Sequence, residues 1–167
     1  QGLTWFSQDE EQTLVTRAQL KARIMGALGG RAAEDVVFGH QEVTTGAGGD
    51  TQRVASMARK MVPRLGMSDL GPVALEGGNQ EVFLGRDLMS RSDISESISQ
   101  QIDEQVRRMV KSCYEETVSL VAANREAMDR LVEMLIEKET MDGAEFAAVV
   151  AEFTQVPDKD RTVVTLD

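Results

Sequence analysis

Apolar side chains recur at helical spacing along most of the chain. The first run contains Leu20, Ile24 and Leu28, and it follows a capping-box pair, Thr16 and Gln19. This pattern predicts a helix over about 17–38. Gly39 is expected to end the helix, because glycine readily adopts the backbone conformation found just after a helix. Two adjacent glycines at 29–30 disfavour a helix, so we expect another element to approach the backbone closely there.

The same spacing predicts five helices in all. The second covers about 49–62, since Pro63 excludes helical geometry from the residue before it. A third, long helix is expected from a cap at Ser92 to about Ala123, and Asn124 is expected to cap a further stretch. A last helix is predicted to start near 140–142. It is expected to bury Phe146, Val149, Val150 and Phe153.

Three stretches lack this spacing. Leu3, Thr4 and Trp5 lie in a short aromatic-rich run that predicts a strand, and five glycines between 66 and 90 predict a small hairpin or irregular excursion. The tail, 154–167, is expected to be mobile. The predicted fold is therefore mainly α, with a short N-terminal strand and an irregular or hairpin segment in the middle.

Charge and composition limit the classes of function that this chain can have. The chain has 18 Lys and Arg against 28 Asp and Glu, a net charge of −10, so nucleic acid is not expected as a partner. No apolar run approaches the roughly 20 residues of a membrane-spanning helix. The chain holds one cysteine and one histidine, which leaves few ligands for a metal site. Because the first residue is Gln1, we expect this chain to be part of a longer protein.

Two carboxylates are candidate functional residues. Asp50 follows a glycine- and threonine-rich loop, 43–49, and either offsets a helix dipole or is presented to a ligand or metal. Glu34 lies among small and apolar residues and is either solvated or buried with a partner. His40 is expected to be a surface turn residue, and Cys113 a small core residue.

Five motifs in the order of the chain resemble the peptidase domain of the FtsH family, membrane-anchored ATP-dependent zinc metalloproteases, in forms from chloroplasts and cyanobacteria. The resemblance covers about 1–153. The motifs are Gly2-Leu3-Thr4-Trp5-Phe6, the run from Ala27-Leu28-Gly29-Gly30-Arg31 to Gly39, Val43-Thr44-Thr45-Gly46-Ala47-Gly48-Gly49-Asp50, Phe83-Leu84-Gly85-Arg86, and Glu137-Lys138-Glu139-Thr140-Met141-Asp142-Gly143.

The resemblance implies a zinc site. In the family, a His-Glu-x-x-His helix supplies two zinc ligands and the general base, and a distant aspartate supplies the third ligand. Asp50 matches that aspartate, and Glu34 matches an acidic residue expected to orient a histidine. ATP and Mg²⁺ would be bound by an ATPase module. The strand at Leu3, Thr4 and Trp5 would bind substrate by strand addition.

This chain departs from the family pattern, because it contains no His-Glu-x-x-His motif. We therefore expect the chain alone to lack peptidase activity, with the missing helix upstream of Gln1. Without metal, the loop 44–50 is expected to be mobile or displaced. Pro63 and Leu65 replace residues that are usually a non-proline and an aromatic in the family.

The resemblance also implies partners and a location. Substrates would be unfolded or damaged membrane proteins, and the intact enzyme would be a homo- or hetero-hexamer that contacts the membrane only through upstream segments. Its location would be the thylakoid membrane with this domain on the stromal side, or the cytoplasmic side of a bacterial inner membrane. Two alternatives remain open: a non-catalytic helical assembly module, and a pseudoprotease.

Overall fold

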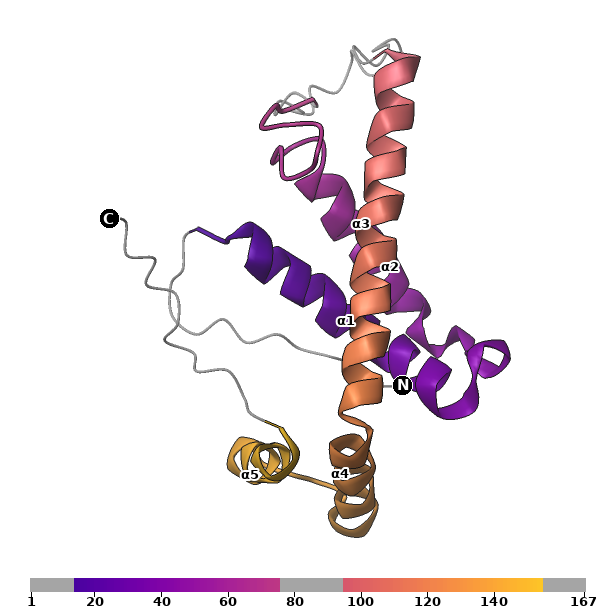
Figure 1. The fold of residues 1–167 in the computed structure, drawn as a ribbon, viewed down its shortest axis with the longest axis vertical. Coiled ribbons are helices and arrows are strands. Elements are labelled where there is room, and N and C mark those ends of the chain that lie inside the picture. The colour runs from indigo at the N-terminus through magenta and orange to yellow at the C-terminus, as the bar shows by residue number, and fades with distance from the viewer. Residues whose placement is uncertain (1–13, 76–94, 155–167) are drawn as a thin grey trace, which may run out of the picture. The chain divides into compact units, whose positions relative to one another are not determined.

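The structure is a computed structural model that describes residues 14–75 and 95–154. Within these two ranges the chain forms five α-helices and two short 3₁₀-helices and no strand, which confirms the mainly α fold (Figure 1). The elements are α1 (Arg17–Phe38), η1 (His40–Glu42), η2 (Thr45–Ala47), α2 (Gly48–Met61), α3 (Glu96–Ala123), α4 (Arg125–Lys138) and α5 (Gly143–Phe153). None of the described helices is long and apolar enough to cross a membrane.

The first helix begins and ends where its sequence signals lie. The Thr16 hydroxyl accepts a hydrogen bond from the Gln19 amide at 3.2 Å, and the Thr16 amide donates to the Gln19 side chain at 2.8 Å. Gly39 follows the last turn with φ = 92°, a conformation that favours glycine. The predicted bounds of α1 are thus confirmed. Within the described residues, the close approach expected at Gly29 and Gly30 is wrong, since an added Cβ at either would meet none of their atoms within 4 Å beyond the helix's own backbone.

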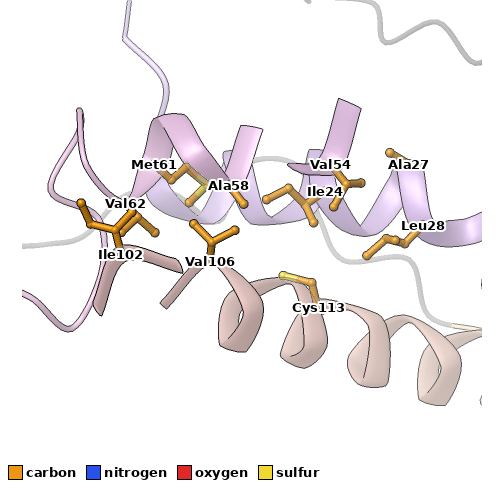
Figure 2. Packing of buried hydrophobic residues seen from close by; sticks show 10 residues of the cluster. All are labelled: Ile24, Ala27, Leu28, Val54, Ala58, Met61, Val62, Ile102, Val106 and Cys113. Carbon is orange, nitrogen blue, oxygen red and sulfur yellow. The ribbon is translucent and has the colours of Figure 1, made fainter. Parts of the chain in front are cut away.

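The chain divides into two compact units, Gln1–Val118 and Ser119–Asp167. The core of the first unit is formed by α1, α2 and α3 together (Figure 2). Cys113 is fully buried in it, as predicted, and burial raises the pKa of its thiol. The buried cluster consists of Ile24, Ala27, Leu28, Val54, Ala58, Met61, Val62, Ile102, Val106 and Cys113.

The second helix ends close to the predicted residue. The last residue of α2 is Met61, and Val62 separates the helix from Pro63. The chain then turns through Gly66, whose φ is 59° and where an added Cβ would lie 3.0 Å from the backbone of Pro72. This turn is the described part of the glycine-rich excursion, and the rest of that predicted hairpin lies outside the described residues. The predicted strand at 3–6 and all but the first residue of the tail 154–167 also lie outside them.

One predicted helix cap lies outside the described residues, and another differs from the structure. Ser92 lies outside the described residues, and Ser95 accepts a hydrogen bond from the Ile98 amide at 3.3 Å at the start of α3. Asn124 occupies the cap position of α4, but its side chain does not cap that helix. The side-chain amide of Asn124 donates instead to the Leu120 carbonyl at 2.8 Å, and so provides a hydrogen bond to a carbonyl in the last turn of α3.

The second unit buries little apolar surface among its described residues. Asp142 caps α5 through a capping box with Glu145, near the predicted start. Val149 is buried, but Phe146 and Phe153 are exposed, so their predicted burial is wrong. Two short helices can cover each other only along one narrow strip, and side chains outside that strip remain in solvent. Val132, Leu135 and Ile136 of α4 are exposed for the same reason.

Candidate functional site

Asp50 lies in the first turn of α2. Its side chain is 35% exposed, and its Oδ1 lies 3.8 Å from Nη1 of Arg53, one turn further on. A contact that long between two accessible groups contributes little to stability. Asp50 therefore presents a carboxylate that a ligand can reach without breaking a strong internal interaction.

Glu34 holds the segment that leads to Asp50. One of its carboxylate oxygens accepts a hydrogen bond from the Thr44 amide at 2.9 Å, and the other accepts from the Thr44 hydroxyl at 2.8 Å. Both oxygens thus bind one residue of the loop, ten positions along the chain. The sequence left two possibilities open, a solvated carboxylate or one buried with a partner. The structure shows the second, since Glu34 is partly buried and bound to Thr44. The identity of that partner could not be predicted, because the spacing of residues in the sequence does not determine the path of the loop.

These hydrogen bonds favour the ionised form of Glu34. The Thr44 amide lowers the pKa of the Glu34 carboxyl most, followed by the Thr44 hydroxyl, and Arg31 lowers it further while burial acts in the opposite direction. A charged acceptor also strengthens both hydrogen bonds. The contact is therefore that of a carboxylate bound by two donors of the same residue.

The loop between Thr44 and Asp50 has a defined conformation. The Thr44 hydroxyl also accepts from the Gly46 amide at 3.2 Å and caps η2, and Gly48 continues directly into α2. Thr51 donates to the Ala47 carbonyl at 3.0 Å. The expectation that this loop is mobile or displaced concerns motion and stays a prediction.

A second carboxylate, Asp35, lies beside Glu34 but contacts other elements. Its Oδ2 accepts a hydrogen bond from the Tyr114 hydroxyl at 2.6 Å and lies 3.4 Å from Nδ1 of His40. His40 is exposed in η1, so its prediction as a surface turn residue is confirmed. No sequence signal links Asp35 to a tyrosine 79 positions away, and this contact was missed.

The described residues do not by themselves fit a zinc ion. A catalytic zinc site takes three protein ligands, commonly histidines and carboxylates. Within 14–75 and 95–154, no three side chains of His, Cys, Asp or Glu lie together in a group that could hold a metal. Asp50 can supply one ligand. The substrate-strand candidates Leu3, Thr4 and Trp5 lie outside the described residues.

The cavities found in the described part of the chain lie away from these carboxylates. One has a volume of about 180 Å³ and is lined by Arg17, Lys21 and Arg108, among others. Lys21 pairs with Glu116, and Arg108 pairs with Glu104. The other, of about 410 Å³, is formed mainly by polar residues of α3. Neither is lined by Asp50 or Glu34.

Acid is expected to release the loop from Glu34. Because the pKa of Glu34 is lowered from its ordinary value of 4.5, the carboxylate's contribution is fully present above pH 4.5 and is lost as pH falls through the lowered pKa. We expect the NMR signal of the Thr44 amide to shift with a midpoint below 4.5. In Glu34→Gln this transition should disappear. A midpoint at or above 4.5 would contradict the bonding seen here.

Comparisons with known proteins agree with the motifs of this site. Residues 1–149 match the family described as Peptidase family M41. The chain is 49% identical over 160 residues to an ATP-dependent zinc metalloprotease FtsH of Trieres chinensis, covering 95% of this chain and 25% of that protein. It is 48% identical over 160 residues to a chloroplastic ATP-dependent zinc metalloprotease FtsH of Arabidopsis thaliana, covering 96% and 23%.

A relative from Cyanidium caldarium, also an ATP-dependent zinc metalloprotease FtsH, is 46% identical over 151 residues. The chain thus spans about a quarter of the length of the curated relatives that it matches. The family match covers most of the chain and includes Glu34, Thr44 and Asp50. This chain belongs to peptidase family M41.

Proposed function

We propose that this chain is part of the peptidase domain of an ATP-dependent zinc metalloendopeptidase that degrades unfolded or damaged membrane proteins. The observation that supports the proposal is the placement of Asp50, which by resemblance corresponds to the family's zinc-binding aspartate. It lies in the first turn of α2, accessible and without a strong internal partner. The family match and the names of the relatives support the same activity.

Within this function, Asp50 supplies one ligand, and the remaining ligands and the general base belong to residues that this chain does not contain. Bound zinc in such a site lowers the pKa of its water to about 7. ATP and Mg²⁺ would be bound elsewhere in the longer protein. Glu34 binds Thr44 through both of its oxygens, and the histidine-orienting role expected by resemblance stays a prediction. Its role here is to hold the segment that carries Asp50.

Location and assembly form part of the same proposal. The names of chloroplastic relatives support a chloroplast location. The finer location that we propose is the thylakoid membrane, with this domain on the stromal side. Assembly as a homo- or hetero-hexamer is supported by the apolar side chains that α4 and α5 leave exposed in the second unit, among them Ile136 and Phe146. Apolar surface of this kind is typical of protein–protein contacts.

The 167-residue chain alone is expected to be inactive. One carboxylate cannot hold a catalytic zinc ion against water, so incubation with unfolded casein and zinc should give no cleavage. The matched control is the longer enzyme, which should cleave casein when ATP and zinc are present. Chelator-sensitive cleavage by the short chain would refute this prediction, and an inactive longer enzyme would favour the pseudoprotease or the assembly module.

Strand addition by Leu3, Thr4 and Trp5 is proposed to hold the substrate. Proline at position 4 removes a backbone donor from such a pairing. In the longer enzyme, Thr4→Pro is therefore expected to raise KM for unfolded casein, with Thr4→Ala as the control that keeps the donor. Equal kinetics in the two variants would show that this segment does not bind substrate by strand addition.

A further inference from the structure

Asp35 connects three elements of the first unit. It lies one residue after Glu34 near the end of α1, and its side chain is 18% exposed. Its Oδ2 accepts from the Tyr114 hydroxyl of α3 at 2.6 Å and lies 3.4 Å from Nδ1 of His40 in η1. The first contact has the length of a charge-assisted O–H···O⁻ hydrogen bond, about 2.5–2.7 Å.

Consecutive positions of a helix face different directions, so Glu34 and Asp35 reach different neighbours. Glu34 holds Thr44, at the start of the turn that leads to Asp50. Asp35 holds the same last turns of α1 against α3 through Tyr114. A change in the orientation of these turns moves both carboxylates together, because they share one stretch of helical backbone.

His40 adds a second connection on the same path. It follows Gly39, where the chain leaves the helix with φ = 92°, and η1 then leads towards Thr44. The contact between His40 and Asp35 joins the residues on either side of Gly39. The segment 39–44 is therefore fixed near its start by Asp35 and at its end by Glu34.

We propose that Asp35 and Tyr114 form a positioning pair: by tying the end of α1 to α3, they set the contact between Glu34 and Thr44 and so the placement of Asp50. The functional consequence of this placement rests on the proposed role of Asp50. The coupling itself does not, and it can be measured in the 167-residue chain.

The chain provides its own probe, since Tyr114 is the only tyrosine. Burial raises the pKa of the Tyr114 hydroxyl, and the hydrogen bond to Asp35 and its negative charge raise it further, whereas Arg31 lowers it. The ultraviolet titration of this one phenol therefore reports whether the pair is intact. In Asp35→Asn, we expect the pKa of Tyr114 to fall.

The decisive measurement is the hydrogen exchange of the Thr44 amide, whose acceptor is Glu34. In Asp35→Asn and in Tyr114→Phe, we expect this exchange to accelerate by about fivefold or more relative to the amides of buried core residues such as Ile24. The matched control is Asp103→Asn, which removes a carboxylate of α3 that pairs with Arg59 of α2 at 2.9 Å. It should leave Thr44 unchanged.

The outcomes separate the positioning role from overall stability. Faster exchange of Thr44 alone supports the pair, and partial recovery in Asp35→Glu would support it further. Unchanged exchange of Thr44 in both variants, or equal acceleration across all amides of the unit, overturns the proposal. In the longer enzyme the two variants should lower kcat with KM unchanged. If Asp50→Asn left peptidase activity intact, the proposed function would fail while the exchange result stood.

Discussion

Replacing Asp50 with Asn is expected to lower kcat of the longer enzyme by about a hundredfold or more. Asparagine keeps the size of the side chain but loses the negative charge and one ligand oxygen, so it binds a divalent cation far more weakly. The fold should be little affected, since the Asp50 side chain is accessible and its contact with Arg53 is 3.8 Å long. The measurement is ATP-dependent casein hydrolysis over a zinc titration.

Asp129 offers a matched control for this substitution. It pairs with Arg125 within one helix, as Asp50 does with Arg53, and its side chain is also accessible. Asp129→Asn removes a closer ion pair, 2.8 Å long, and should leave kcat unchanged. Unchanged kcat in both the Asp50 and the Asp129 variant would exclude Asp50 as a metal ligand. An equal loss in both would show that the effect comes from surface charge.

The helices with strong local signals could be predicted from the sequence. Thr16, Gln19 and Gly39 fix the ends of α1 by hydrogen bonds and backbone geometry that involve only neighbouring residues. Pro63 places the end of α2 in the same way. The position of Asp50 could be predicted too, because a glycine-rich loop followed by an apolar repeat sets the start of a helix.

Features that depend on distant residues could not be predicted. The partner of Glu34 follows from the path of the loop after Gly39, and the partner of Asp35 from the packing of α3 on α1. The exposure of Phe146 has a similar origin: helical spacing indicates which face is apolar but not how much of that face a neighbouring helix covers. Asn124 could satisfy either of two adjacent helix ends, and only the structure shows which.

The core of the first unit should depend strongly on Ile24. This side chain is completely buried between residues of α1, α2 and α3 (Figure 2). Ile24→Ala removes apolar contacts and leaves a cavity, so we expect the free energy of unfolding to fall by about 2–5 kcal/mol. The measurement is urea unfolding followed by circular dichroism, in which the midpoint should fall while the slope stays constant.

Ile136 makes the matched comparison, since the same residue type is 76% exposed in α4. Ile136→Ala deletes the same atoms but opens no cavity, and we expect it to change the free energy of unfolding by less than about 0.5 kcal/mol. The difference between the two variants then measures burial rather than residue type. If both substitutions lowered the free energy of unfolding equally, Ile24 would not lie in a packed core. The packing of α1 on α2 would then not explain the placement of Glu34 and Asp50.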